Sequence, residues 1–216
     1  MSRTVYLLGG LYLLAVAWFG PLPQLAGTSF AAHMGLHLIL IAGAAPLIAM
    51  GLSGTRIDAR LASLGLLNPI LASVAELVVV WAWHAPGLHD ASRGSTGVFV
   101  IEQASFLAVG LLLWLSAVGT AGGGERRAAI GVVGMLLTSM HMALLGALLN
   151  LAPRPLYHHQ GDAALADQQL GGLLMLVIGG TVYLIAGLWL LARVLRERPE
   201  SSGPANCANV LGKTPR

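Results

Sequence analysis

Residues 30–52 read FAAHMGLHLILIAGAAPLIAMGL, a run of 23 residues that holds no Asp, Glu, Lys or Arg. A helix needs roughly 20 apolar residues to cross the hydrocarbon core of a bilayer, so this run predicts a transmembrane helix. His33 and His37 lie four residues apart near its start, and a helix places both imidazoles on one face. Because an ionisable side chain inside a span is costly, the pair indicates a functional site.

Five further stretches of the chain are dominated by apolar side chains. They run over Val5–Phe19, Pro69–Trp83, Val98–Val118, Ala128–Leu151 and Gln169–Leu195. Hydrophobic residues make up 56% of the chain and charged residues only 10%, whereas about a quarter of a soluble domain is charged. We therefore expect an all-α protein, a polytopic transmembrane helical bundle of about six spans over residues 1–196.

The two ends of the chain carry their own signals. Residues 197–216 are rich in Ser, Pro, Gly and Asn, which predicts a disordered cytoplasmic tail. The lone cysteine, Cys207, lies in this tail, so neither a disulfide framework nor a Cys-rich metal site is expected. Ala15–Ala17 is similar to a signal-peptidase site, and cleavage there would remove residues 1–17 and leave five spans.

The basic residues predict the orientation of the bundle. The chain has 12 Lys and Arg, and all but Arg93 and Arg154 fall at the two termini or in the loops that follow the second and fourth stretches. Basic residues concentrate in cytoplasmic loops, so both termini are predicted to be cytoplasmic. The same residues are too scattered to form a nucleic-acid surface, and the bilayer is the expected surrounding.

With this orientation, polar side chains from five helices gather in the outer half of the bundle. Four histidines are the candidate metal ligands, namely His33, His37, His84 and His141. The other side chains that could bind or support a metal there are Met34, Glu76, His89, Asp90, Glu102, Met140, Met142, Asp167 and Gln168. Thioether together with imidazole selects Cu(I), so copper, as Cu(I), is the expected metal.

Each of these residues also has a simpler interpretation. His141 could hydrogen-bond a neighbouring helix, His84 and His89 could lie at the membrane interface, and the methionines could fill the core. Residues 167–169 could cap a helix, and His158 and His159 could be solvated in an outer loop. Glu76 and Glu102 could orient a histidine or carry a proton.

Several separated motifs resemble the CtaG-type cytochrome c oxidase assembly factors of bacteria. The match covers most of residues 30–180, in the family's order. The motifs are His33-Met34-x-x-His37 with Ala45-Pro46-Leu47 and Gly51, Trp83-His84-x-Pro86 with Asp90-Ala91, Glu102 with Phe106, Trp114, His141-Met142-x-Leu144-x-Gly146-Ala147, Pro155-Leu156-Tyr157, and Ala166-Asp167-Gln168-Gln169-Leu170-Gly171-Gly172 with Met175.

The resemblance implies a multi-pass protein of the bacterial plasma (inner) membrane that is needed to make active haem–copper oxidase. It implies copper binding at the periplasmic face, no catalysed reaction, and two partners: an oxidase core subunit and a periplasmic copper chaperone. The chain departs from the family at two places. Family members often carry histidines where this chain has Phe99 and Gln103, and a tyrosine where it has His89.

Two other classes of protein stay open at this point. Histidines that face one another across helices can ligate haem, which would make the chain a haem or redox protein. Polar groups within the bundle could also serve a transporter of metal or protons, although the cytoplasmic half is largely apolar. A membrane hydrolase is not expected, because no serine or cysteine lies near a plausible base.

Overall fold

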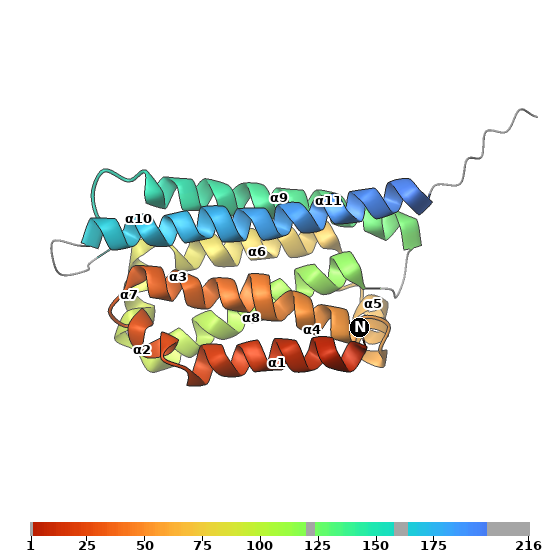
Figure 1. The fold of residues 1–216 in the computed structure, drawn as a ribbon, viewed down its shortest axis with the longest axis horizontal. Helices are drawn as coiled ribbons and strands as arrows, with labels where there is room; N and C mark the ends of the chain where they lie inside the picture. Colours follow the sequence, from red (N-terminus) through yellow and green to blue (C-terminus); the bar gives the residue numbers. More distant parts are fainter. Residues whose placement is uncertain (1, 120–123, 158–163, 198–216) are drawn as a thin grey trace, which may run out of the picture.

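The computed structural model describes residues 2–119, 124–157 and 164–197, and it contains no β-strand in these ranges. Six long helical rods lie side by side in the described part of the chain (Figure 1). They are α1 (Arg3–Phe19), the run of α3 (Phe30–Leu38), η1 (Ile39–Ala44) and α4 (Ala45–Leu52), α6 (Pro69–Trp83), α8 (Thr96–Val118), α9 (Gly124–Asn150), and the run of α10 (Ala164–Leu174), η2 (Met175–Gly179) and α11 (Gly180–Glu197). The all-α prediction is confirmed, and each predicted apolar stretch coincides with one rod to within a few residues at its ends.

The rods differ in their ability to cross a membrane. Among the described residues, four are long and apolar enough: Phe30–Leu52, Thr96–Val118, Arg126–Asn150 and Ala164–Arg196. A fifth span is obtained if α6 and the short helix α7 (Pro86–Gly94) count as one segment bent by 72°. The 17-residue α1 is apolar but is not long enough to be counted among these spans. The helices fit a multi-pass membrane protein, but the predicted count of six spans is not confirmed.

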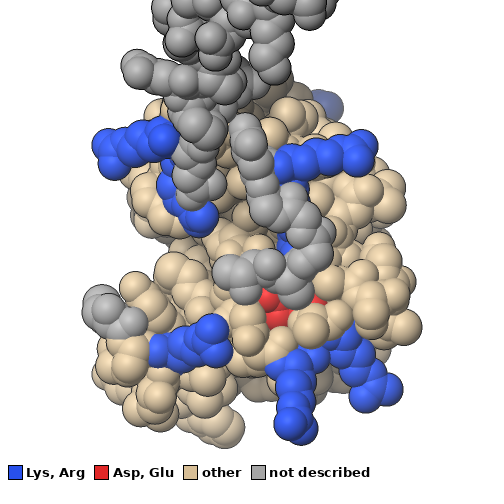
Figure 2. Space-filling view, turned by 90° about the vertical axis from the view of Figure 1, so that its right-hand side faces the viewer, with Lys and Arg blue, Asp and Glu red and all other residues tan. Residues whose placement is uncertain are grey.

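Both ends of the described chain lie at one end of the bundle (Figure 1). Figure 2 shows this end face with Lys and Arg side chains spaced around it. The short helix α5 (Arg56–Ser63) contributes Arg56 and Arg60 there, and Arg127 at the start of α9 donates to the carbonyl of Leu115 (2.7 Å). The basic side chains near the termini and in these loops therefore lie at one end of the bundle. That this end faces the cytoplasm stays a prediction.

A π-helical segment, η1, interrupts the rod that begins with α3. It ends two residues before Pro46, which has no N–H to bond a carbonyl in the preceding turn. The carbonyl of Ile41 instead accepts hydrogen bonds from Trp114 Nε1 (2.9 Å) and Tyr183 Oη (3.3 Å). Since π-turns change the rotation of a helix about its axis, η1 sets how the two halves of this rod face the bundle.

Glycines let the sixth rod approach its neighbours closely. A Cβ atom on Gly172 would lie 2.5 Å from the backbone nitrogen of Asn150 and 2.8 Å from the carbonyl oxygen of Gly146. A Cβ atom on Gly171 would clash with Phe30 and come within 3.0 Å of Met34 Cγ. Small residues at helix crossings are typical of membrane bundles, and here they bring α10 against both α9 and the first turns of α3.

Candidate metal centre

The first turns of α3 and α8 meet at a buried cluster of His33, His37 and Glu102. Nε2 of His33 lies 3.2 Å from Oε1 of Glu102, and Nε2 of His37 lies 3.6 Å from the same oxygen. The two imidazole centroids are 4.3 Å apart, so the predicted i, i+4 pairing on one helix face is confirmed. One ligand atom from each residue lies within 4.8 Å of the others, and none of the three residues is more than 3% exposed.

Gln103 joins this cluster from the position next to Glu102. Its Nε2 donates to Oε2 of Glu102 (3.2 Å) and lies 3.3 Å from Nδ1 of His37. Nε2 of His37 is buried and has no hydrogen-bond partner among the described residues. The sequence departs from the family at Gln103, yet this side chain contacts both a histidine and the carboxylate. In the sequence, the only sign that Gln103 belongs to the site is its position beside Glu102 inside a predicted span, where polar residues are rare.

His84 extends the cluster from the C-terminal end of α6. Its Nδ1 lies 2.6 Å from the carbonyl oxygen of Val80, and its Nε2 lies 3.1 Å from Sδ of Met34. Its ring centroid is 6.1 Å from that of His37. His89 on α7 packs against the other side, with its ring 4.9 Å from that of His33. Four histidines and one thioether from α3, α7 and the end of α6 therefore form a continuous buried group with Glu102 of α8.

Asp167 fixes the start of α3, which carries the first histidine. Its carboxylate accepts hydrogen bonds from the backbone nitrogens of Phe30 (2.6 Å) and Ala31 (3.2 Å) and from Oγ of Ser29 (2.8 Å). A negative charge at a helix N-terminus is stabilising because it satisfies free N–H groups and the helix dipole. The sequence suggested that residues 167–169 cap the span that follows them; Asp167 instead lies in the first turn of α10 and caps α3, a helix far away in the sequence.

Tyr157 and Gln168 hold the described part of the loop, residues 151–157, against the cluster. Tyr157 donates to the carbonyl of His84 (2.9 Å) and stacks on Phe30 with centroids 4.7 Å apart. Burial raises the pKa of the Tyr157 hydroxyl, and the nearby charge of Asp90 raises it further, so the group stays a donor at neutral pH. Gln168 accepts from the backbone nitrogen of Leu156 (2.6 Å) and so supports the loop rather than the cluster.

Several predicted site residues lie elsewhere in the bundle. Ser73 on α6 contacts Thr138 on α9 at 2.8 Å, so His141 lies near the level of Glu76, about 12 Å along the helix axis from His84. Both ring nitrogens of His141 are buried without a hydrogen-bond partner among the described residues. Oε1 of Glu76 accepts from Tyr183 Oη (2.5 Å).

The methionines of α9 are also separate from the cluster. Met140 is 69% exposed on the outside of the bundle, whereas Met142 is fully buried beside Gly179. His158, His159 and Cys207 lie outside the described residues. The structure therefore gathers His33, His37, His84, His89, Met34 and Glu102, and it leaves His141, Glu76, Met140 and Met142 apart.

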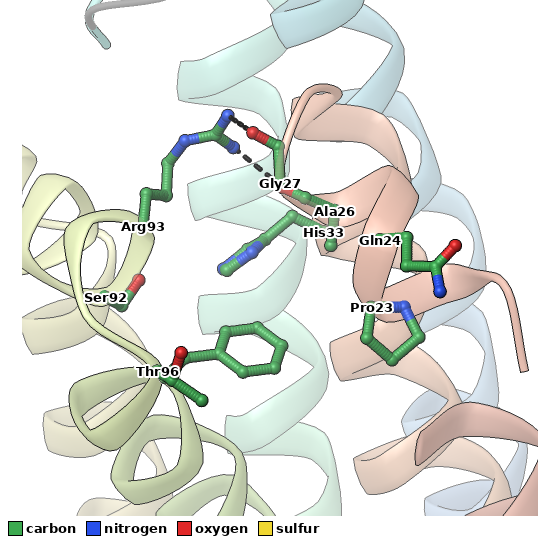
Figure 3. A pocket seen from close by; sticks show the side chains of 9 residues that line it. Pro23, Gln24, Ala26, Gly27, His33, Ser92, Arg93 and Thr96 are labelled. Atoms are coloured by element: carbon green, nitrogen blue, oxygen red, sulfur yellow. Dashed lines mark hydrogen bonds between the residues drawn. The ribbon is translucent and has the colours of Figure 1, made fainter. Parts of the chain in front are cut away.

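A cavity of about 290 Å³ leads from the surface to His33. In Figure 3 the ring of His33 extends from α3 toward the side of α7, where Ser92 and Arg93 lie. Arg93 donates to the carbonyl oxygens of Ala26 (2.9 Å) and Gly27 (2.5 Å), which ties α7 to the end of the short helix α2 (Leu22–Ala26). Arg93 had stood out in the sequence only as one of two basic residues on the predicted outer side.

The comparisons with known proteins give one finding. Residues 1–197 match the family model described as Cytochrome c oxidase caa3 assembly factor (Caa3_CtaG). No curated protein and no solved structure matches the chain significantly.

Proposed function

Because this chain belongs to the cytochrome c oxidase caa3 assembly factor family, we propose that it binds copper through the buried histidine cluster and delivers it to the haem–copper oxidase. The metal is Cu(I), the recipient is an oxidase core subunit, and the cluster faces the periplasm of a bacterial inner membrane. A periplasmic copper chaperone is the source of the metal. The chain catalyses no reaction, since its task is to hold the ion and hand it on.

The buried group of His33, His37 and Glu102 carries this proposal. Nε2 of His37 is buried without a hydrogen-bond partner among the described residues, and Glu102 lies 3.6 Å away, too far for a good hydrogen bond. An unsatisfied buried polar atom costs about 1–3 kcal/mol, so such an atom persists where it has a role. A cation bound between the two imidazoles and the carboxylate would satisfy the nitrogen and balance the charge of Glu102.

The donors on the Met34 side of the cluster favour copper over other metals. The cluster offers imidazole nitrogens and, through Met34 beside His84, a thioether sulfur (3.1 Å from His84 Nε2). The single cysteine of the chain lies in the tail, far along the sequence from these ligands. Thioether and imidazole together suit Cu(I), whereas structural zinc sites are built mainly from thiolates and histidines.

The surroundings suit an ion that must enter and leave. The ligands are attached to helices whose starts and ends are capped or hydrogen-bonded, so the site is preorganised. The cavity that ends at His33 gives access from one side. A haem protein has less support, because the void between His37 and His84 is only about 10 Å³, enough for about one water-sized group.

Oxidase assembly in cells that lack the native chain tests the proposal. Cells that produce the His37→Ala variant should make an oxidase with normal haem and too little copper, because His37 lies beside both Glu102 and the void at His84. His141→Ala is the matched control and should support normal copper content. An oxidase that is fully metallated in His37→Ala cells would refute the proposal.

A further inference from the structure

When its ring is neutral, His84 faces Met34 with no proton between Nε2 and the sulfur. The carbonyl of Val80, 2.6 Å from Nδ1 of His84, can only accept, so Nδ1 carries the ring proton. In the neutral ring, Nε2 then presents its lone pair to Sδ of Met34 at 3.1 Å. A thioether has no hydrogen to donate, so two electron-pair donors lie in contact. A cation that binds both would turn this contact into a favourable one.

A small void adjoins this pair. It measures about 10 Å³ and is lined by His37, His84, Met34 and Met175, with aliphatic side chains and Phe106 around them. Metal–nitrogen and metal–sulfur bonds of roughly 2.0 and 2.3 Å would let one ion contact atoms that are 3.1 Å apart. The glycine at position 171 leaves room for the Met34 side chain, because a Cβ there would come within 3.0 Å of Met34 Cγ.

The carboxylate position is a different place in the same cluster. Glu102 and His33 do not line the void, and His84 is not part of the group of His33, His37 and Glu102. Only His37 lies at both, with its ring 6.1 Å from that of His84. The two donor sets also differ in chemistry, since one combines imidazole with thioether and the other combines imidazole with carboxylate.

We infer that the cluster holds two metal positions with different preferences. His84, Met34 and Met175 form a soft position for Cu(I), and His33, His37 and Glu102 form a harder position for a divalent ion such as Cu(II) or Zn(II). Thioethers select Cu(I), while carboxylate and imidazole accept divalent ions. This inference rests on the proposed function for the identity of the cargo, and it revises where that cargo binds. The unsatisfied nitrogen of His37 marks the cluster as a metal site, but the Cu(I) to be delivered occupies the soft position, and the group of His33, His37 and Glu102 holds competing divalent ions.

Metal titration of the full chain in detergent, without oxygen, tests the two positions. Ag(I) serves as the probe of the soft position and Zn(II) as the probe of the hard one. The titrations use a Cys207→Ser background, because a free thiolate binds the same soft ions. The background chain should bind both ions at once, and X-ray absorption of its Cu(I) form should detect sulfur next to copper.

Paired variants then separate the positions. Met34→Leu conserves volume; it should weaken Ag(I) binding about tenfold or more and leave Zn(II) binding unchanged. Loss of a group that only hydrogen-bonds a metal ligand already costs roughly 10- to 100-fold in metal affinity, so loss of a ligand should cost at least as much. Glu102→Gln should do the reverse. Met142→Leu, a buried methionine outside the void, should change neither.

Three outcomes would overturn the inference. They are competition of Ag(I) and Zn(II) for one position, equal weakening of both ions by both variants, and unchanged Ag(I) binding in Met34→Leu. In each of these cases copper binding by the cluster would still stand. A background chain that binds no metal would overturn the proposed function as well.

Discussion

Removing the Asp167 carboxylate should loosen the helix start that carries the first histidine. Asp167→Ala deletes three hydrogen bonds, from Ser29 Oγ (2.8 Å) and from the backbone nitrogens of Phe30 (2.6 Å) and Ala31 (3.2 Å). Ser29 continues to accept from the backbone nitrogen of Ala32, so part of the cap survives. His33 lies three residues beyond Phe30, within the first turn of α3.

The magnitude follows from the type of bond. A hydrogen bond to a charged group contributes about 1.5–3 kcal/mol, and loss of a helix cap costs about 0.5–2 kcal/mol. The three bonds share one half-buried carboxylate and are not additive, so we expect Asp167→Ala to lower the free energy of unfolding by roughly 2–4 kcal/mol. If about 1.4 kcal/mol of this loss destabilises the first turn of α3, copper binding must re-form that turn. Copper affinity then drops about tenfold.

The assay is reversible unfolding of the purified chain in mixed detergent, together with a copper titration. Asp167→Asn should cost less than Asp167→Ala, because its amide oxygen still accepts but carries no charge. Gln169→Ala is the control in the same turn of α10, since no described group hydrogen-bonds its side chain. The reasoning is refuted if Asp167→Ala unfolds and binds copper as the wild type does.

Three further changes test separate parts of the structure. Gly172→Ala should lower the unfolding free energy by about 1–3 kcal/mol, because its Cβ would lie 2.5 Å from the Asn150 nitrogen. The control Gly35→Ala has open space around it and should be close to neutral. Equal effects of the two variants would contradict the close helix crossing at Gly172. His141→Ala should retain full copper in metal analysis, because His141 lies apart from the cluster. A large loss of copper would show that His141 is a ligand after all. A reporter active only in the periplasm should work at Gly94, and one active only in the cytoplasm should work at the C-terminus; the opposite pattern would contradict the orientation.

The sequence predicted the helices and the first pair of ligands for clear physical reasons. Apolar length alone identified the rods, and the i, i+4 spacing of His33 and His37 required them to share a face. The alternating direction of the rods then brought Glu102 to the same level. These features depend on position along a helix axis, which a sequence specifies well.

Contacts that depend on helix rotation were not predictable in the same way. The approach of Met34 to His84 depends on how α3 and α6 turn about their axes, and the hydrogen bonds of Asp167 to α3 link residues 136 to 138 positions apart. Rotation is set by close crossings such as that at Gly172 and by π-turns such as η1, and apolar periodicity does not reveal either. Met140 illustrates the same point, since its neighbour His141 is buried while Met140 faces outward.

Copper content of the purified chain tests the central claim most directly. Wild-type protein loaded with Cu(I) without oxygen and then desalted should retain at least one copper per chain. The His37→Ala/His84→Ala variant, which removes a histidine from each side of the cluster, should retain almost none while eluting as a folded protein with unchanged helix content. Full copper in this double variant, or none in the wild type, would contradict the account.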